Sequence, residues 1–132
     1  MIKIGLDIHG VITHIPEYFK ELSEVLVAAG HEVHIITGRS LKTPEFLEKI
    51  KSTGVKYTHI FSVTDHLIEQ GNPVRWSDEY NPWFEEGLWN KVKGKYCEDN
   101  KIGLMIDDSP EYLEHFTTPV ALMISKTNFP IK

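Results

Sequence analysis

The chain has 132 residues, of which 41% are hydrophobic and 25% are charged, and its formal net charge at pH 7 is −5. This length predicts a single domain over residues 1–132, and the composition excludes a disordered or repetitive chain. The acidic charge disfavours nonspecific binding to nucleic acid or to an anionic membrane. It is compatible with a phosphorylated substrate, because a bound cation inverts the local charge.

Cysteine and histidine usage excludes several other kinds of site. The single Cys97 allows no internal disulfide and fits a reducing compartment. Two histidine pairs, His31 with His34 and His59 with His66, invite a metal-site interpretation, but no recognised metal-binding motif surrounds them. We therefore interpret them as surface or strand residues. No apolar segment is long enough for a signal peptide or a membrane span, so we expect a cytoplasmic protein without a membrane partner.

Strand-like and helix-like segments alternate along the chain. Short apolar runs predict strands at residues 2–8, 33–37, 57–63, 101–106 and 120–124. Apolar residues at helical spacing predict helices at 16–29 and 44–52, which Gly30 and Gly54 close. This order is typical of a doubly wound α/β domain, with a Rossmann-like, mainly parallel five-stranded sheet and helices on both faces.

One long segment, residues 64–90, fits the alternation less well. A short helix is expected after Asp65, followed by an aromatic loop that contains Trp76, Trp83 and Trp89. Long loops in compact domains are often functional, so this segment is a candidate small lid. Two interpretations stay open: the tryptophans stack on a substrate base, or they pack the loop onto the sheet.

Polar residues end three of the predicted strands: Asp7 the first, Thr37 the second, and Asp107 with Asp108 the fourth. In parallel sheets the site forms at the carboxyl ends of the strands, so these side chains should converge. Converging carboxylates repel one another, and a hard cation with oxygen ligands, Mg²⁺, relieves that repulsion. In such a site Asp7 could attack phosphorus, while Thr37 and a nearby lysine bind the phosphate oxygens.

The same residues resemble motifs of the haloacid dehalogenase-like superfamily. Residues 6–13 (LDIHGVIT) resemble its first motif, residues 36–39 (ITGR) its second and residues 105–109 (MIDDS) its fourth, in order and across nearly the whole chain. The resemblance implies a nearly capless, Mg²⁺-dependent phosphohydrolase that forms an aspartyl-phosphate. Its substrate would be a small phosphate monoester or a nucleotide; nucleic acid would bind only through a phosphorylated end. We expect a monomer or a small homo-oligomer.

The resemblance also implies metal ligands and phosphate-binding residues. Asp7 would be the nucleophile and a metal ligand, and the backbone carbonyl of His9 a second ligand. Asp107 or Asp108 would supply a further carboxylate, directly or through water. Thr37 would hold the phosphate as a catalytic and substrate-binding residue.

Three further positions follow from the second and third motifs. Gly38 and Arg39 continue the substrate-binding segment, where Arg39 either reaches the substrate or forms a salt bridge. The third motif is a lysine on the helix before the fourth strand, for which Lys91, Lys93 and Lys95 compete. We prefer Lys93 as the catalytic and substrate-binding lysine, because it precedes Asp107 by 14 residues, a spacing common among relatives.

The chain departs from the family pattern at His9. Phosphatases of this superfamily usually carry an aspartate there, which acts as general acid and base. An imidazole, with an ordinary pKa of about 6.5, can do the same work. Three interpretations stay open: a phosphohydrolase that uses His9 in catalysis, a slow member or one with different chemistry, and a non-catalytic protein that binds Mg²⁺ and a phosphorylated ligand.

Overall fold

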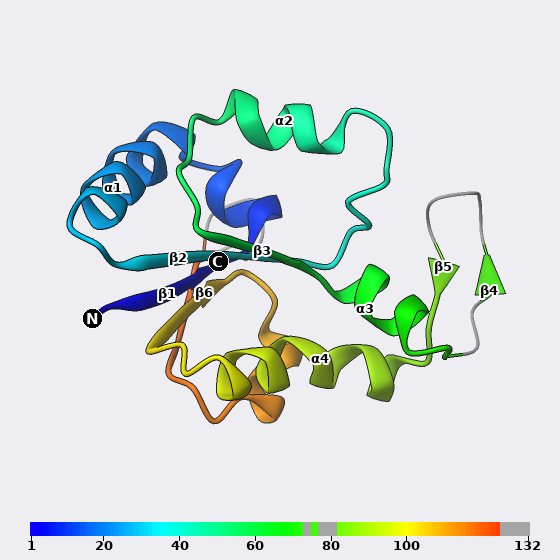
Figure 1. Cartoon of the computed structure of the whole chain (residues 1–132). Coiled ribbons are helices and arrows are strands. Elements are labelled where there is room, and N and C mark those ends of the chain that lie inside the picture. The colour runs from blue at the N-terminus through cyan, green and yellow to red at the C-terminus, as the bar shows by residue number, and fades with distance from the viewer. Residues whose placement is uncertain (73–74, 77–81, 125–132) are drawn as a thin grey trace, which may run out of the picture.

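A five-stranded, all-parallel sheet forms the centre of the computed structural model, which describes residues 1–72, 75–76 and 82–124 (Figure 1). The strand order is β3-β2-β1-β6-β7. The strands are β1 (Lys3–Leu6), β2 (Glu32–Thr37), β3 (His59–Ser62), β6 (Leu104–Asp107) and β7 (Val120–Leu122). The predicted Rossmann-like α/β class and all five predicted strands are confirmed.

Helices cover both faces of the sheet (Figure 1). One face carries α1 (Pro16–Ala28) and α2 (Phe46–Ser52), and the other carries α3 (Val63–Glu69) and α4 (Glu86–Asp99). Short turns η1 (Ile8–Ile12) and η2 (Pro110–His115) follow β1 and β6. Within the described residues, no helix has the length and apolar character that crossing a membrane requires.

The two faces of β2 pack against different helices, because successive side chains of a strand point in opposite directions. Val33 and Ile35 are fully buried in a cluster with Phe19 of α1 and Phe46 of α2. Ile36, on the opposite face, is buried with Cys97 of α4. Each such side chain stabilises the fold by roughly 1.5–3 kcal/mol through burial. Burial also raises the pKa of the Cys97 thiol to about 12, which disfavours the nucleophilic thiolate form.

The predicted aromatic loop at 64–90 is only partly a loop. Helix α3 begins at Val63, strands β4 (Arg75–Trp76) and β5 (Pro82–Trp83) pair antiparallel, and α4 begins at Glu86. Trp89 is therefore helical and packs on Gly38, where an added Cβ would lie 2.8 Å from its ring. The side chains of the other two tryptophans lie outside the described residues, so the lid stays a prediction.

Candidate metal and phosphate site

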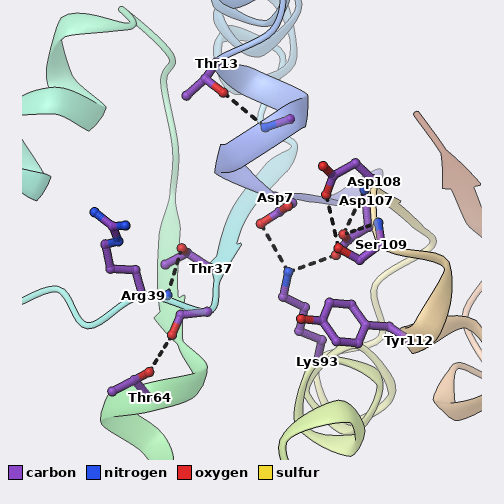
Figure 2. Close-up of polar contacts among 12 residues, drawn as sticks. Asp7, Thr13, Thr37, Arg39, Thr64, Lys93, Asp107, Asp108, Ser109 and Tyr112 are labelled. Atoms are coloured by element: carbon purple, nitrogen blue, oxygen red, sulfur yellow. Dashed lines mark hydrogen bonds and ion pairs between the residues drawn. The ribbon is translucent and has the colours of Figure 1, made fainter. Parts of the chain in front are cut away.

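The carboxyl ends of adjacent parallel strands bring three carboxylates together (Figure 2). Asp7 follows β1 directly, while Asp107 ends β6 and Asp108 comes next; β6 pairs with β1. One oxygen from each carboxylate lies within 4.8 Å of the others. Because β2 pairs with β1 on its other side, Thr37 reaches the same edge of the sheet. The strand-end residues singled out in the sequence therefore lie at one place.

The ammonium of Lys93 lies between two of these carboxylates. Its Nζ donates to Asp7 Oδ1 at 3.1 Å and to Asp107 Oδ2 at 2.9 Å, and its side chain is only 5% exposed. Lys95, by contrast, is 75% exposed and pairs with Asp99 within its own helix. Lys91 borders a separate recess between α3 and α4. Of the three candidate lysines, Lys93 is the one that the fold places among the carboxylates.

Asp107 and Asp108 have different surroundings. Asp107 is buried, and its Oδ1 accepts hydrogen bonds from the backbone N–H groups of Asp108 at 2.8 Å and Ser109 at 3.1 Å. With Lys93 on its other oxygen, Asp107 is fully engaged within the protein. Asp108 accepts a hydrogen bond from the Ser109 hydroxyl at 3.3 Å and lines the adjacent cavity together with Asp7. Asp108 is thus the more accessible carboxylate.

The charges of this cluster do not balance. Three carboxylates and one ammonium leave two negative charges when all are ionised. Burial raises the pKa of Asp7 to about 7; Lys93 opposes this rise, and Asp107 and Asp108 add to it. Burial alone would lower the pKa of Lys93, but the Asp7 and Asp107 carboxylates hold it above its ordinary value. The donor set, all oxygen and short of two positive charges, could hold a metal cation that prefers oxygen ligands.

The Asp7 carboxyl gives the protein a predicted pH dependence. Its pKa is about 7 in the fold against an ordinary 3.8, so between these values the folded state holds a proton that the unfolded state has released. Stability therefore falls as pH rises through this interval when no divalent cation is present. Asp7→Asn removes this contribution. In urea unfolding with EDTA, we expect the unfolding free energy of the variant to rise relative to that of wild type between about pH 5 and about pH 8. A difference in unfolding free energy that does not change with pH would contradict the raised pKa of Asp7.

A cavity of about 390 Å³ opens beside the carboxylates. Its lining consists of Asp7, His9, Thr37, Gly38, Arg39, Ser40, Thr64, Trp89, Lys93, Asp108, Ser109 and Tyr112. All four predicted substrate-binding residues, Thr37, Gly38, Arg39 and Lys93, are among them. The cavity is large enough for a phosphoryl group and a small leaving group.

Hydrogen bonds connect the loop after β2 to the start of α3. The carbonyl of Gly38 accepts a hydrogen bond from the Thr64 hydroxyl at 2.6 Å (Figure 2). The Asp65 carboxylate accepts from the Ser40 hydroxyl at 2.5 Å and from the Leu41 backbone N–H at 2.9 Å. These bonds fix the segment that starts at Thr37, so its hydroxyl and backbone groups keep their place at the cavity wall.

Arg39 forms no ion pair within the described residues. Its guanidinium carbon lies 5.7 Å from the centre of the Phe46 ring, a cation–π contact that holds it at the cavity wall. Of the two alternatives for Arg39, the salt bridge is not formed among these residues. The guanidinium remains available to an anion in the cavity.

Trp89, which is predicted as part of the aromatic loop, and Tyr112, which has no predicted role, form another wall. Trp89 Nε1 donates to the hydroxyl of Tyr112 at 3.1 Å, and the Lys93 ammonium lies 5.1 Å from the centre of the Tyr112 ring. Tyr112 comes three residues after Ser109, within η2, and this spacing carried no recognisable signal. The pair shields Lys93 from water and thereby strengthens its interaction with the carboxylates.

His9 lies in the turn that leaves β1. Gly10 has φ +78°, which favours glycine, and its N–H donates to the Thr13 hydroxyl at 3.1 Å. The His9 ring stacks on Phe46, with centroids 6.0 Å apart and an interplanar angle of 19°. Partial burial lowers the His9 pKa, and the charges of Arg39 and Lys49 lower it further. A neutral imidazole can accept a proton at neutral pH, but it is a poor donor.

Comparison of the chain with models of known protein families, with curated proteins and with solved structures finds no match. The structure shows a parallel α/β fold and a buried acidic cluster that could bind a metal ion. A fold of this kind does not specify a function, whereas the geometry of a site can.

Proposed function

We propose that the chain is a Mg²⁺-dependent phosphohydrolase of the haloacid dehalogenase-like superfamily, in which Asp7 forms an aspartyl-phosphate. One observation carries the proposal: the carboxylates of Asp7, Asp107 and Asp108 lie together at the carboxyl edge of a parallel sheet, beside a cavity, and the Lys93 ammonium pairs with Asp7 and Asp107. The sequence motifs at the same positions support it. When bound, Mg²⁺ would neutralise the two excess negative charges and polarise the phosphoryl oxygens.

Each residue has a distinct task in this proposal. Asp7 Oδ attacks phosphorus as the bond to the leaving oxygen breaks, and water later attacks the phosphorus of the aspartyl-phosphate to release inorganic phosphate. Lys93 and Thr37 bind the phosphoryl oxygens and stabilise their charge. Asp108 and the His9 carbonyl would be metal ligands with Asp7. Asp107, held by two backbone N–H groups, positions Lys93.

The cavity favours a small substrate. Its volume of about 390 Å³ suits a compact phosphate monoester, and a second recess of about 470 Å³ shares Arg39 with it. We infer that Arg39 binds an acceptor group of the substrate outside the transferred phosphate. A nucleotide would extend into the second recess, and a nucleic acid would enter only by a phosphorylated end.

His9 limits the first half of the reaction, in which the leaving group departs. A neutral imidazole suits activation of water for hydrolysis of the aspartyl-phosphate, but the leaving group must depart without an efficient proton donor. We therefore propose that wild type prefers phosphate esters with an acidic leaving group. The same observation supports the alternative function: a protein that binds Mg²⁺ and a phosphorylated ligand without efficient hydrolysis.

A comparison of His9→Asp with wild type tests this proposal. We expect wild type with Mg²⁺ to hydrolyse p-nitrophenyl phosphate, and EDTA to abolish the reaction. We expect His9→Asp to hydrolyse alkyl phosphates about tenfold or more faster than wild type, because general acid catalysis typically contributes 10²–10⁴-fold to the rate. The exposed His14 provides the matched control, and His14→Asp should behave as wild type.

The outcomes separate the two functions. If wild type is inert and only His9→Asp turns over, the chain is a binding protein with a degenerate active site. If all three proteins are inert while Mg²⁺ and phosphate bind, the phosphohydrolase proposal fails and the binding function remains. If nothing binds, both fail.

A further inference from the structure

A second group of metal-ligating side chains lies on β2 and β3, apart from the carboxylate site. Glu32 and His34 are two residues apart on β2, so their side chains share one face of the sheet. His59 on β3 is the register partner of His34 in the parallel pairing. We propose that Glu32, His34 and His59 bind a borderline divalent cation, Zn²⁺ in the first instance, independently of the proposed phosphohydrolase function.

The donor atoms are close to a metal-binding arrangement. Glu32 Oε1 lies 2.8 Å from His34 Nε2 and 3.9 Å from His59 Nδ1, and one donor atom of each residue lies within 4.8 Å of the others. A tetrahedral zinc ion with bonds of roughly 2.0–2.2 Å needs donors a little over 3 Å apart. The other carboxylate oxygen of Glu32 faces Lys3 at 3.8 Å, which leaves Oε1 directed at the two histidines.

His34 is the fixed ligand of this group. Its ring is buried, and Nδ1 makes a hydrogen bond of 2.7 Å with the Tyr96 hydroxyl. His34 Nε2 lies 2.8 Å from Glu32 Oε1, and a carboxylate oxygen accepts, so in the metal-free fold Nε2 carries the ring proton. When a metal takes Nε2, that proton moves through solvent to Nδ1, and Tyr96 becomes the acceptor. Such an outer partner fixes the ring of a metal-binding histidine.

His59 is the adjustable ligand. Its ring stacks on that of His34, with centroids 4.1 Å apart and planes within 5°. Parallel rings do not direct both lone pairs at one point, so His59 must turn toward Glu32 to bind an ion. The His59 side chain is 49% exposed. Its Nδ1, the nitrogen that would bind the ion, forms a hydrogen bond of 2.8 Å with the Thr58 hydroxyl. The exposed side gives the ring room to turn and leaves a coordination position for water.

The three donor groups determine which metal the site prefers and how its binding would affect the fold. Two imidazoles and one carboxylate favour Zn²⁺ over Mg²⁺, which prefers oxygen ligands. The ion would join the edge strand β3 to β2. Because the three donors are assembled only in the folded chain, binding should stabilise the fold.

Zinc titration of the full chain tests the proposal. We expect calorimetry to show one zinc ion bound by Glu32, His34 and His59, and zinc to raise the melting temperature. Glu32→Gln and His59→Gln change exposed or half-exposed groups and should fold; each should weaken this binding at least about tenfold, since even the partner of a ligand typically contributes 10–100-fold. Asp108→Asn, which alters the other cluster, is the matched control and should bind zinc at this site as wild type does.

Three results would overturn the inference. The first is the absence of zinc binding, and the second is zinc binding that Glu32→Gln and His59→Gln leave unchanged. The third is zinc binding that disappears in Asp108→Asn, which would place the ion among the carboxylates. None of these results bears on phosphatase activity with Mg²⁺, so the two proposals fail separately.

Discussion

Asp7→Asn is expected to abolish Mg²⁺-dependent phosphate release, with kcat lower by a factor on the order of 10⁴ or more, as for the loss of an enzyme nucleophile. The amide keeps the shape of the side chain but lacks the charged oxygen that attacks phosphorus. Initial rates with saturating Mg²⁺ and p-nitrophenyl phosphate measure the effect.

The structure supplies a control for misfolding. Because burial already opposes ionisation of Asp7, the neutral amide should leave the melting temperature in EDTA near pH 8 unchanged or higher. An Asp7→Asn protein that is folded and retains more than about a hundredth of wild-type kcat would exclude Asp7 as the nucleophile.

Lys93→Met is expected to cost about 3–5 kcal/mol of unfolding free energy, because it leaves the buried carboxylates of Asp7 and Asp107 without their cation. Lys95→Met lies on the same helix, and its salt bridge with Asp99 is exposed on both sides, so this matched control should change stability little. Urea unfolding of both variants in EDTA measures the difference.

Mg²⁺ should raise the folding stability of Lys93→Met more than that of wild type. The variant cluster carries more uncompensated negative charge, so the cation should recover part of the lost stability. Equal losses in the two lysine variants would contradict the ion-pair role of Lys93. A Lys93→Met protein that is stable in EDTA and unaffected by Mg²⁺ would do the same.

The fold could be predicted because local pattern and topology agree. Apolar runs ended by polar residues marked the strands, and the parallel-sheet rule placed their carboxyl ends together. That rule predicts that Asp7, Thr37 and the Asp107–Asp108 pair converge, and the three carboxylates do lie together. The boundaries were less accurate: α2 begins at Phe46 instead of residue 44, because Glu45 has φ +62° and cannot continue the helix.

The rest depended on tertiary contacts. Helix α4 buries two polar side chains, Asn90 and Lys93, so its pattern is weak and residues up to 90 were predicted as loop. Which of the three lysines faces the carboxylates depends on how α4 is rotated about its axis against the sheet, and the sequence does not specify that rotation. The pairing of His34 with His59 required the register of β2 on β3, whereas sequence proximity pointed to His31, whose ring accepts the Ile2 N–H instead.

The position of His9 was equally inaccessible to sequence. Its ring stacks on Phe46 of α2, which is 37 residues further along the chain. Partial burial at this position lowers the His9 pKa, and the charges of Arg39 and Lys49 lower it further. The positive charges of Arg39 and Lys49 disfavour the charged form of a histidine, whereas they would favour the charged form of an aspartate. His9→Asp therefore changes the acid–base chemistry at this position.

Trapping the aspartyl-phosphate tests the proposed chemistry most directly. The protein is mixed with a phosphoryl donor and Mg²⁺, quenched in acid at short times, digested and analysed by mass spectrometry. We predict a mass gain of one phosphoryl group on the peptide that contains Asp7, dependent on Mg²⁺ and absent from Asp7→Asn. Phosphate release without any such adduct at early times, or an adduct on another residue, would contradict nucleophilic attack by Asp7.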